Sequence, residues 1–215
     1  MSDIFKEVDE EVRRDQALAF WNKYQNQFIA LGLIVVAAAG GWRWYQNQQR
    51  AAAEAAGARY EAALQLSRDG KASDADAALQ EIIKQGPAGY ALLARFRGAS
   101  ELAATDKAKA VSIYDGLAND NAVAAPMRDV ARLRAAMLRV DEADAAEIKN
   151  RLEALAAPGA PFRNTARELL AFAAFKANDF EAAAKWLDAI VVDAQAPQSI
   201  RARAEALLGL VSGGK

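Results

Sequence analysis

Cysteine and histidine are both missing from the 215 residues, and their absence removes whole classes of chemistry. Without histidine the chain cannot form a Ser-His-Asp triad or a Cys-His pair, and zinc would lack its usual nitrogen and sulfur ligands. Without cysteine the fold needs no disulfide, although this does not separate an oxidising compartment from a reducing one. The sequence also contains no phosphate loop, dinucleotide fingerprint or metal-ligand cluster. We therefore expect no enzyme, no cofactor and no metal site.

An excess of charge of either sign is missing too, because the formal net charge is −1. Proteins that bind nucleic acid or an anionic bilayer surface normally carry a basic patch. One short acidic cluster, Asp141, Glu142 and Asp144, lies at a predicted turn. We interpret it as the solvated first turn of a helix rather than as a paired-carboxylate site. No nucleic acid partner is expected.

Long apolar runs are scarce, and the only one is FIALGLIVVAAAGGW over residues 28–42. As a helix it is about 22 Å long, which falls between a buried core helix and a bilayer span. Aromatic rings at both ends favour a span, because such rings collect at membrane interfaces. The expected membrane-interface residues are Trp21, Tyr24, Trp42, Trp44 and Tyr45. We predict a transmembrane anchor over residues 21–45, with a soluble core helix as the alternative.

The residues before this run bear on whether the anchor is retained. A cleaved signal peptide begins with a short basic leader, whereas the first 27 residues here hold six acidic and four basic side chains. We therefore expect the anchor to stay attached. Its orientation does not follow from charge, because each flank carries three basic residues. These are Arg13, Arg14 and Lys23 before the run, and Arg43, Arg50 and Arg59 after it.

Residues 1–20 read as an amphipathic N-terminal tail. Ile4, Phe5, Val8 and Val12 fall on one helical face, opposite acidic and arginine residues. The acidic residues make it a poor lipid-binding helix. It is either a docking helix for a protein beside the membrane or a polar tail.

Residues 46–69 continue the helical pattern past a single tolerated glycine, Gly57. We predict that the span runs on as a stalk and first repeat helix, with Tyr60, Ala63 and Leu64 joining the soluble domain. Asp69-Gly70-Lys71 supplies a glycine C-cap that ends this helix.

Residues 70–215 repeat an apolar stripe with i, i+4, i+7 spacing, which is typical of one buried helix face. The four stripes are Ala75/Leu79/Ile82, Ala110/Tyr114/Leu117, Ile148/Leu152/Leu155 and Ala183/Leu187/Ile190. Companion helices are expected at 89–103, 126–140, 162–177 and 198–211, with Asp106 and Asp179 as N-caps. Trp186 and Phe180 are interpreted as core residues. Helical hairpins repeating at about 35 residues indicate an α-solenoid of the tetratricopeptide kind, capped by the last helix. The predicted fold class is all-α, a single transmembrane helix followed by a degenerate tetratricopeptide-like α-solenoid.

Arginine recurs with the same period. Arg95, Arg132, Arg167 and Arg201 each fall in the first helix of a hairpin, and a second arginine lies nearby in each: Arg97, Arg134, Arg163 and Arg203. First helices of such hairpins line the concave face, where a guanidinium can bind a partner carboxylate through two parallel bonds. We predict partner binding by the first four. The alternative is that they are surface arginines paired with nearby acids such as Asp129 and Glu168.

The opening DIFKEVDEEVRRDQ, the anchor ending in GWRWY and the degenerate repeats together resemble the YfgM-like family. Its members are ancillary subunits of the bacterial SecYEG translocon. The resemblance implies a single-pass protein of the bacterial inner membrane, with a cytoplasmic N-terminus and a periplasmic repeat domain. It also implies association with the translocon, with a periplasmic membrane-anchored chaperone and with exported proteins.

The function expected is a non-catalytic membrane-anchored adaptor that binds protein partners at the Sec translocon and assists the handling of exported proteins. The alternative is a membrane-anchored scaffold whose repeats lie in the cytoplasm and bind a signalling or regulatory protein.

Overall fold

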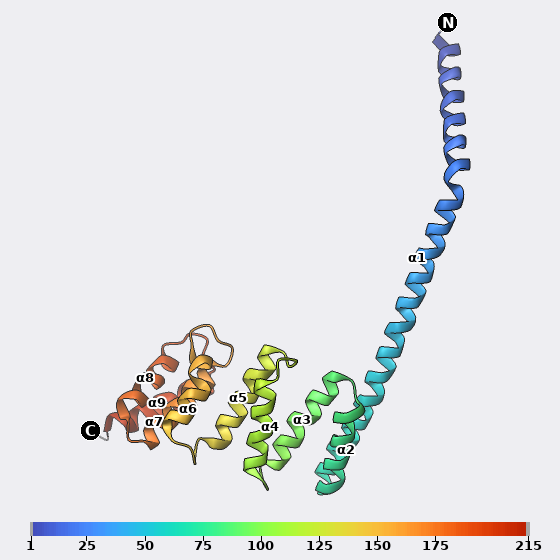
Figure 1. Cartoon of the computed structure of the whole chain (residues 1–215). Coiled ribbons are helices and arrows are strands. Elements are labelled where there is room, and N and C mark those ends of the chain that lie inside the picture. Colours follow the sequence, from blue (N-terminus) through green and yellow to red (C-terminus); the bar gives the residue numbers. More distant parts are fainter. Residues whose placement is uncertain (1, 214–215) are drawn as a thin grey trace. The chain divides into compact units, whose positions relative to one another are not determined.

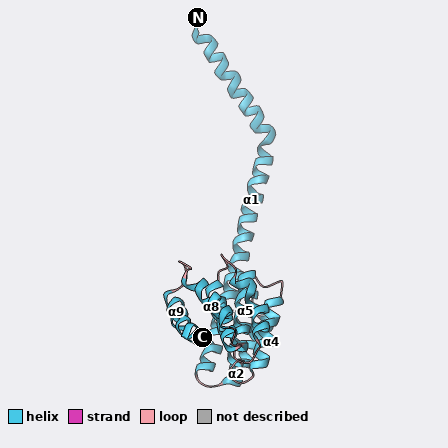
Figure 2. Cartoon of the chain, turned by 90° about the vertical axis from the view of Figure 1, so that its left-hand side faces the viewer, coloured by secondary structure: helices cyan, strands magenta, loops and turns pink. Residues whose placement is uncertain are grey.

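The computed structural model describes the backbone of residues 2–213 and the side chains of residues 13–15 and 18–211. These residues form nine α-helices and one short 3₁₀ helix, and they contain no strand (Figures 1 and 2). The predicted all-α fold is therefore confirmed. The chain divides into two compact units, Met1–Ala55 and Ala56–Lys215.

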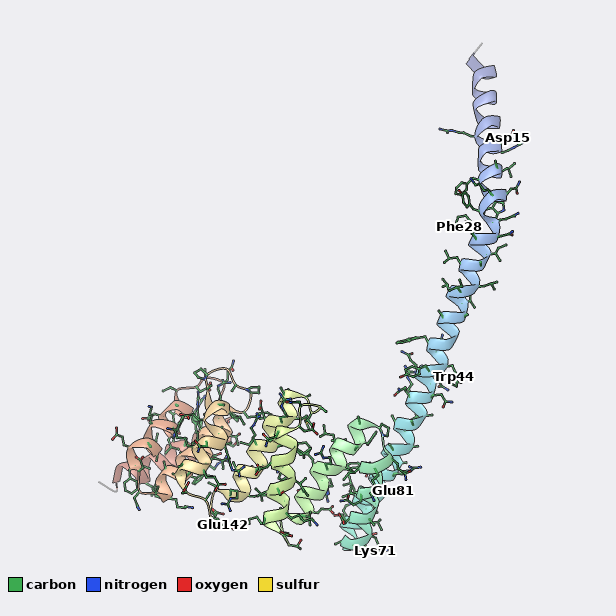
Figure 3. The ribbon with its side chains drawn as sticks, in the orientation of Figure 1. Asp15, Phe28, Trp44, Lys71, Glu81 and Glu142 are labelled. Atoms are coloured by element: carbon green, nitrogen blue, oxygen red, sulfur yellow. The ribbon has the colours of Figure 1, made fainter. Side chains whose placement is uncertain are left out.

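The first unit consists of most of helix α1, Ser2–Arg68. Its apolar side chains point away from the helix axis, as Phe28 and Trp44 do in Figure 3. Leu33 and Val36, in the middle of the apolar run, are 66% and 69% exposed. The helix is therefore long and apolar enough to cross a membrane, and its apolar run is exposed among the described residues. The side chains of Ile4, Phe5, Val8 and Val12 lie outside those described.

The last turns of α1 belong to the second unit, where Ala63 is fully buried and Tyr60 packs against Tyr90. Gly57 allows this approach, because a Cβ atom there would lie 2.7 Å from the Tyr90 hydroxyl. The helix ends at Arg68, and Gly70 follows it with a φ of +75°. The Lys71 N–H donates to the Leu66 carbonyl at 2.9 Å, which completes a Schellman motif. The predicted continuous helix and its glycine end are confirmed.

Four of the other helices begin and end within two residues of the predicted companion segments, and the remaining four contain the stripes apart from Leu155. They are α2 (Ala72–Gln85), α3 (Ala88–Leu102), α4 (Lys107–Asn119), α5 (Ala125–Arg139), α6 (Ala145–Leu152), α7 (Arg163–Lys176), α8 (Phe180–Val191) and α9 (Gln198–Gly213). Asp106 and Asp179 accept backbone N–H hydrogen bonds at 3.0 Å as the predicted N-caps. Asp144, from the acidic cluster, caps α6 in the same way through the Glu147 N–H.

All twelve stripe residues are buried, so the periodic pattern correctly identified the core. The core is not one body but four small clusters, and each joins a stripe helix to the helices before and after it. No hairpin buries its stripe alone, because the neighbouring hairpin supplies part of each cluster. Stability therefore depends on stacking, as expected of a repeat array.

One stripe departs from the predicted helix. α6 ends at Leu152, and Leu155 lies in a 3₁₀ turn, η1 (Glu153–Ala156). This tighter turn precedes Pro158, which cannot continue a helix. Leu155 is still 5% exposed, so the turn keeps the apolar contact while it changes the helix type.

Candidate functional site

The four predicted partner-binding arginines lie on companion helices, and their guanidinium groups reach the C-terminal ends of the stripe helices α4 and α8. Arg95 on α3 donates to the Asp120 carboxylate at 3.2 Å, and Asp120 directly follows α4. Arg132 on α5 donates to Asp129 at 2.7 Å and to the Ala118 carbonyl in the last turn of α4 at 3.2 Å. Carbonyls in the last turn of a helix, such as that of Ala118, have no partner within their own helix and carry the helix's partial negative charge.

Arg167 and Arg201 repeat the arrangement at the end of α8. Arg167 is 7% exposed and donates to the Ala156 carbonyl at 3.1 Å and the Ala189 carbonyl at 2.9 Å. Arg201 on α9 donates to the Asp193 carbonyl at 2.8 Å. All four guanidinium groups thus have partners within the protein. Binding of an external partner by these residues stays a prediction.

Asp193, just after α8, is the acceptor at the centre of this region. Its carboxylate accepts from Arg163 at 2.9 Å, from Arg167 at 3.3 Å and from the Gln195 N–H at 2.9 Å. The hydrogen bonds from Arg163 and then from the Gln195 backbone hold the pKa of Asp193 well below its usual range. Asp193 therefore remains ionised and joins α7, α8 and the start of α9.

The arginines that lie near the four predicted ones differ in their pairing. Arg97 pairs with Glu101 at 2.7 Å, and Arg203 pairs with Glu168 through two bonds of 2.6 and 2.9 Å. Glu168 thus pairs with a second arginine, whereas Asp129 pairs with Arg132, one of the four recurring arginines. Arg134 is exposed and forms no ion pair among the described residues.

The five expected membrane-interface residues lie in two groups on α1. Trp21 stacks on Phe28 with ring centroids 6.1 Å apart, and Tyr24 lies near Phe20. Trp42 and Tyr45 contact each other at 6.4 Å, and Trp44 is 67% exposed. The rings bracket the apolar run as predicted, and their insertion in a bilayer stays a prediction.

Six charged side chains form a continuous series across α4, α5 and α6, which we call the central ion network. Its members are Lys107, Glu142, Arg139, Glu147, Arg151 and Asp115. Successive ion pairs measure 2.6, 3.4, 2.8, 3.0 and 2.6 Å in that order. Hydrogen bonds from Arg139 lower the pKa of Glu147 to about 2, with Arg151 adding to the effect against partial burial. The network therefore links α4 to α6, directly through the pair of Asp115 with Arg151.

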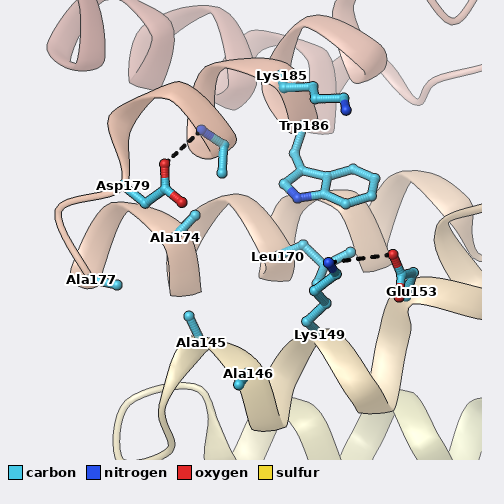
Figure 4. A pocket seen from close by; sticks show the side chains of 11 residues that line it. Ala145, Ala146, Lys149, Glu153, Leu170, Ala174, Ala177, Asp179, Lys185 and Trp186 are labelled. Carbon is cyan, nitrogen blue, oxygen red and sulfur yellow. Dashed lines mark hydrogen bonds and ion pairs between the residues drawn. The ribbon is translucent and has the colours of Figure 1, made fainter.

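The groove between α6 and α8 is open, and α7 forms its floor. Its cavity, the Trp186 pocket, has a volume of about 370 Å³ (Figure 4). The lining residues are Ala145, Ala146, Lys149, Glu153, Leu170, Ala174, Ala177, Asp179, Ala182, Lys185 and Trp186. The lining is mostly apolar, and this volume lies within the range of about 300–1,000 Å³ found for ligand pockets. The Trp186 ring packs on the cores of two repeats, as predicted, and also forms a wall of the pocket.

A second cavity of about 370 Å³ lies between α2 and α4, with α3 as its floor. Ile83, Leu102 and Ile113 supply its apolar lining, and Asp76 and Arg95 supply the charges. Arg95 is already paired with Asp120. This cavity therefore offers no unpaired cation.

The sequence interpretation missed both cavities and the role of Asp193. Asp193 had a periodic signal, because Asp120 stands at the same distance after its stripe and also accepts from an arginine of the preceding helix. Among the residues that the structure describes, no group of three possible metal ligands comes together.

A comparison with protein families matches residues 18–169 to the tetratricopeptide repeat-like domain. The match begins ahead of the apolar run and extends into α7, so it includes the run, the stalk and most of the repeats. A search of curated proteins and a search of solved structures each found no match. Because the match covers more than half of the 215 residues, the chain belongs to the tetratricopeptide repeat-like domain family.

Proposed function

We propose that the protein is a non-catalytic, membrane-anchored adaptor that binds protein partners at the Sec translocon and helps to handle exported proteins. The family supports the general part of this proposal, because tetratricopeptide-like repeats typically bind other proteins. The observation that carries the anchored part is the apolar run of α1, whose side chains are exposed among the described residues.

The anchor gives the adaptor a physical advantage. A repeat domain joined to a membrane helix meets a membrane-bound partner at a raised effective concentration, even if each contact is weak. The family match includes the apolar run together with the repeats, which supports treating them as one functional unit.

The translocon and chaperone partners come from the resemblance to the YfgM-like family. On that basis we place the N-terminus in the bacterial cytoplasm and the repeats in the periplasm, beside a membrane-anchored chaperone. The aromatic groups at 21–24 and 42–45 support a single membrane passage.

Photo-crosslinking from the anchor tests the translocon assignment. We expect a crosslinking residue at Ile29, Leu33 or Val36 of the full chain to form adducts with translocon subunits in intact cells. The same residue at exposed Ala58, outside the span, serves as the control. If no anchor position gives such an adduct, the protein is a membrane scaffold without a Sec role.

An alkaline phosphatase fusion tests the orientation. We expect the enzyme fused after Lys215 to be active, because it folds only when exported. The enzyme fused after Gln27, ahead of the apolar run, should be inactive. An inactive fusion after Lys215 would favour the alternative, in which cytoplasmic repeats bind a signalling or regulatory protein.

A further inference from the structure

The Trp186 pocket and the central ion network occupy the same position in consecutive repeats. Counting 38 residues on from α4 and 35 residues on from α5 and α6 gives the equivalent positions. Each network member maps onto a pocket residue: Lys107 to Ala145, Asp115 to Glu153, Arg139 to Ala174, Glu142 to Ala177, Glu147 to Ala182 and Arg151 to Trp186. Four charged side chains are thus replaced by alanine, and a cavity lies where the preceding repeat has the ion network.

The open groove keeps its shape without these side chains. Ala174 is 6% exposed and Leu170 is 3% exposed, so the floor is a packed part of the core. The pocket is therefore a formed hollow with an apolar floor and an indole wall. Aromatic walls of this kind are typical of sites that hold a large apolar side chain.

The charges at the rim favour one kind of ligand. Lys185 is exposed and has no ion pair among the described residues. Lys149 lies 3.7 Å from Glu153, and both side chains are more than half exposed, so this pair is weak. Asp179 accepts the Ala182 N–H as the N-cap of α8. Of the two lysines and two carboxylates in the lining, Lys185 is therefore the one with no hydrogen bond or ion pair among the described residues, so a ligand carboxylate can pair with it.

We propose that the Trp186 pocket docks a segment of a partner protein that presents a large apolar side chain next to a carboxylate. The apolar side chain enters the alanine-lined hollow against Trp186, and the carboxylate pairs with Lys185. That the ligand is a protein segment rests on the adaptor function proposed above. The evidence for the site itself is that alanine stands in this repeat where the preceding repeat has charged residues of the central ion network.

Peptide binding to the full chain in lipid nanodiscs tests the site. The probes are three fluorescein-labelled dodecapeptides with a Gly-Ser backbone and a central Phe-Glu, Ala-Glu or Phe-Lys pair. Empty nanodiscs give the background. We expect the Phe-Glu peptide to bind at least about tenfold more tightly than either of the others, measured by fluorescence anisotropy. Equal binding of all three would overturn the proposal.

A variant with larger side chains in the Trp186 pocket tests whether the peptide binds there. Ala174→Arg with Ala182→Glu imports the Arg139 and Glu147 pair of the preceding repeat, so we expect the melting temperature to be kept. The Kd of the Phe-Glu peptide should rise at least about tenfold. Unchanged affinity in the filled, folded variant would place the binding elsewhere and overturn the proposal.

A charge reversal at the rim covers the case in which the filled variant does not fold. Lys185→Glu changes an exposed residue, and we expect it to remove the preference for Phe-Glu over Phe-Lys. Lys109→Glu, an equally exposed lysine on α4 outside both cavities, should leave the preference unchanged. A preference that survives Lys185→Glu would contradict the assigned role of Lys185.

The two proposals fail separately. Peptide docking at the pocket without translocon crosslinks would remove the Sec role and leave the site. Translocon crosslinks with no peptide preference, and with no effect of filling the groove, would remove the site and leave the Sec role.

Discussion

Replacing Arg167 by alanine should lower the stability of the repeat domain by about 3 kcal/mol. Arg167 is 7% exposed and donates to two carbonyls and the Asp193 carboxylate, on both sides of α7. Its loss leaves buried acceptors without a donor and opens a gap at the end of α8. For a domain of this size, the melting temperature should fall by about 6–12 °C, followed by circular dichroism of the full chain in detergent.

Arg134→Ala is the matched control, because Arg134 is exposed and forms no ion pair among the described residues. We expect its effect on stability to stay within about 0.5 kcal/mol. Arg167→Lys keeps the charge but loses the fork of donors, so it should recover only part of the stability. If Arg167→Ala melts like the parent chain and yet loses a bound partner, Arg167 acts at an interface rather than in the fold.

The stripe residues could be predicted from the sequence because the signal is local. Ala110, Tyr114 and Leu117 fall on one face of a single helix, and a helix buries its apolar face whatever lies opposite. The N-caps Asp106 and Asp179 were equally readable, since a cap acts within one turn. The end of α1 at Arg68, just before Gly70, follows from the conformation that glycine allows.

The partners of the arginines could not be predicted in the same way. Their spacing was visible, but Arg95 and Arg167 bind acids 25 and 26 residues further on. Only the stacking of one helix on the next brings these groups together. A surface arginine and an arginine that caps a neighbouring helix look alike in the sequence.

The Trp186 pocket was even harder to predict from the sequence than the arginine partners. Alanine on a helix reads as a residue that allows close packing, and at Ala183 it does pack closely. At Ala174 and Ala182 the alanine borders a cavity instead. The difference depends on what the facing helices supply, so it appears only when the pocket is compared with the central ion network of the preceding repeat.

Two aspartates placed in the apolar run should remove the protein from the membrane. At the centre of a span, aspartate is less favourable than leucine or valine by about 3–4 kcal/mol, so Leu33→Asp with Val36→Asp should cost about 6–8 kcal/mol. The measurement is the fraction of full-length protein that stays with membranes after a carbonate wash.

Ala52→Asp with Ala55→Asp, two exposed positions further along α1, provides the matched control and should leave membrane retention unchanged. Full retention of the Leu33→Asp, Val36→Asp protein after the carbonate wash would contradict the anchor. The association would then have to come from contacts outside residues 28–42, because a bilayer does not tolerate two such charges at its centre.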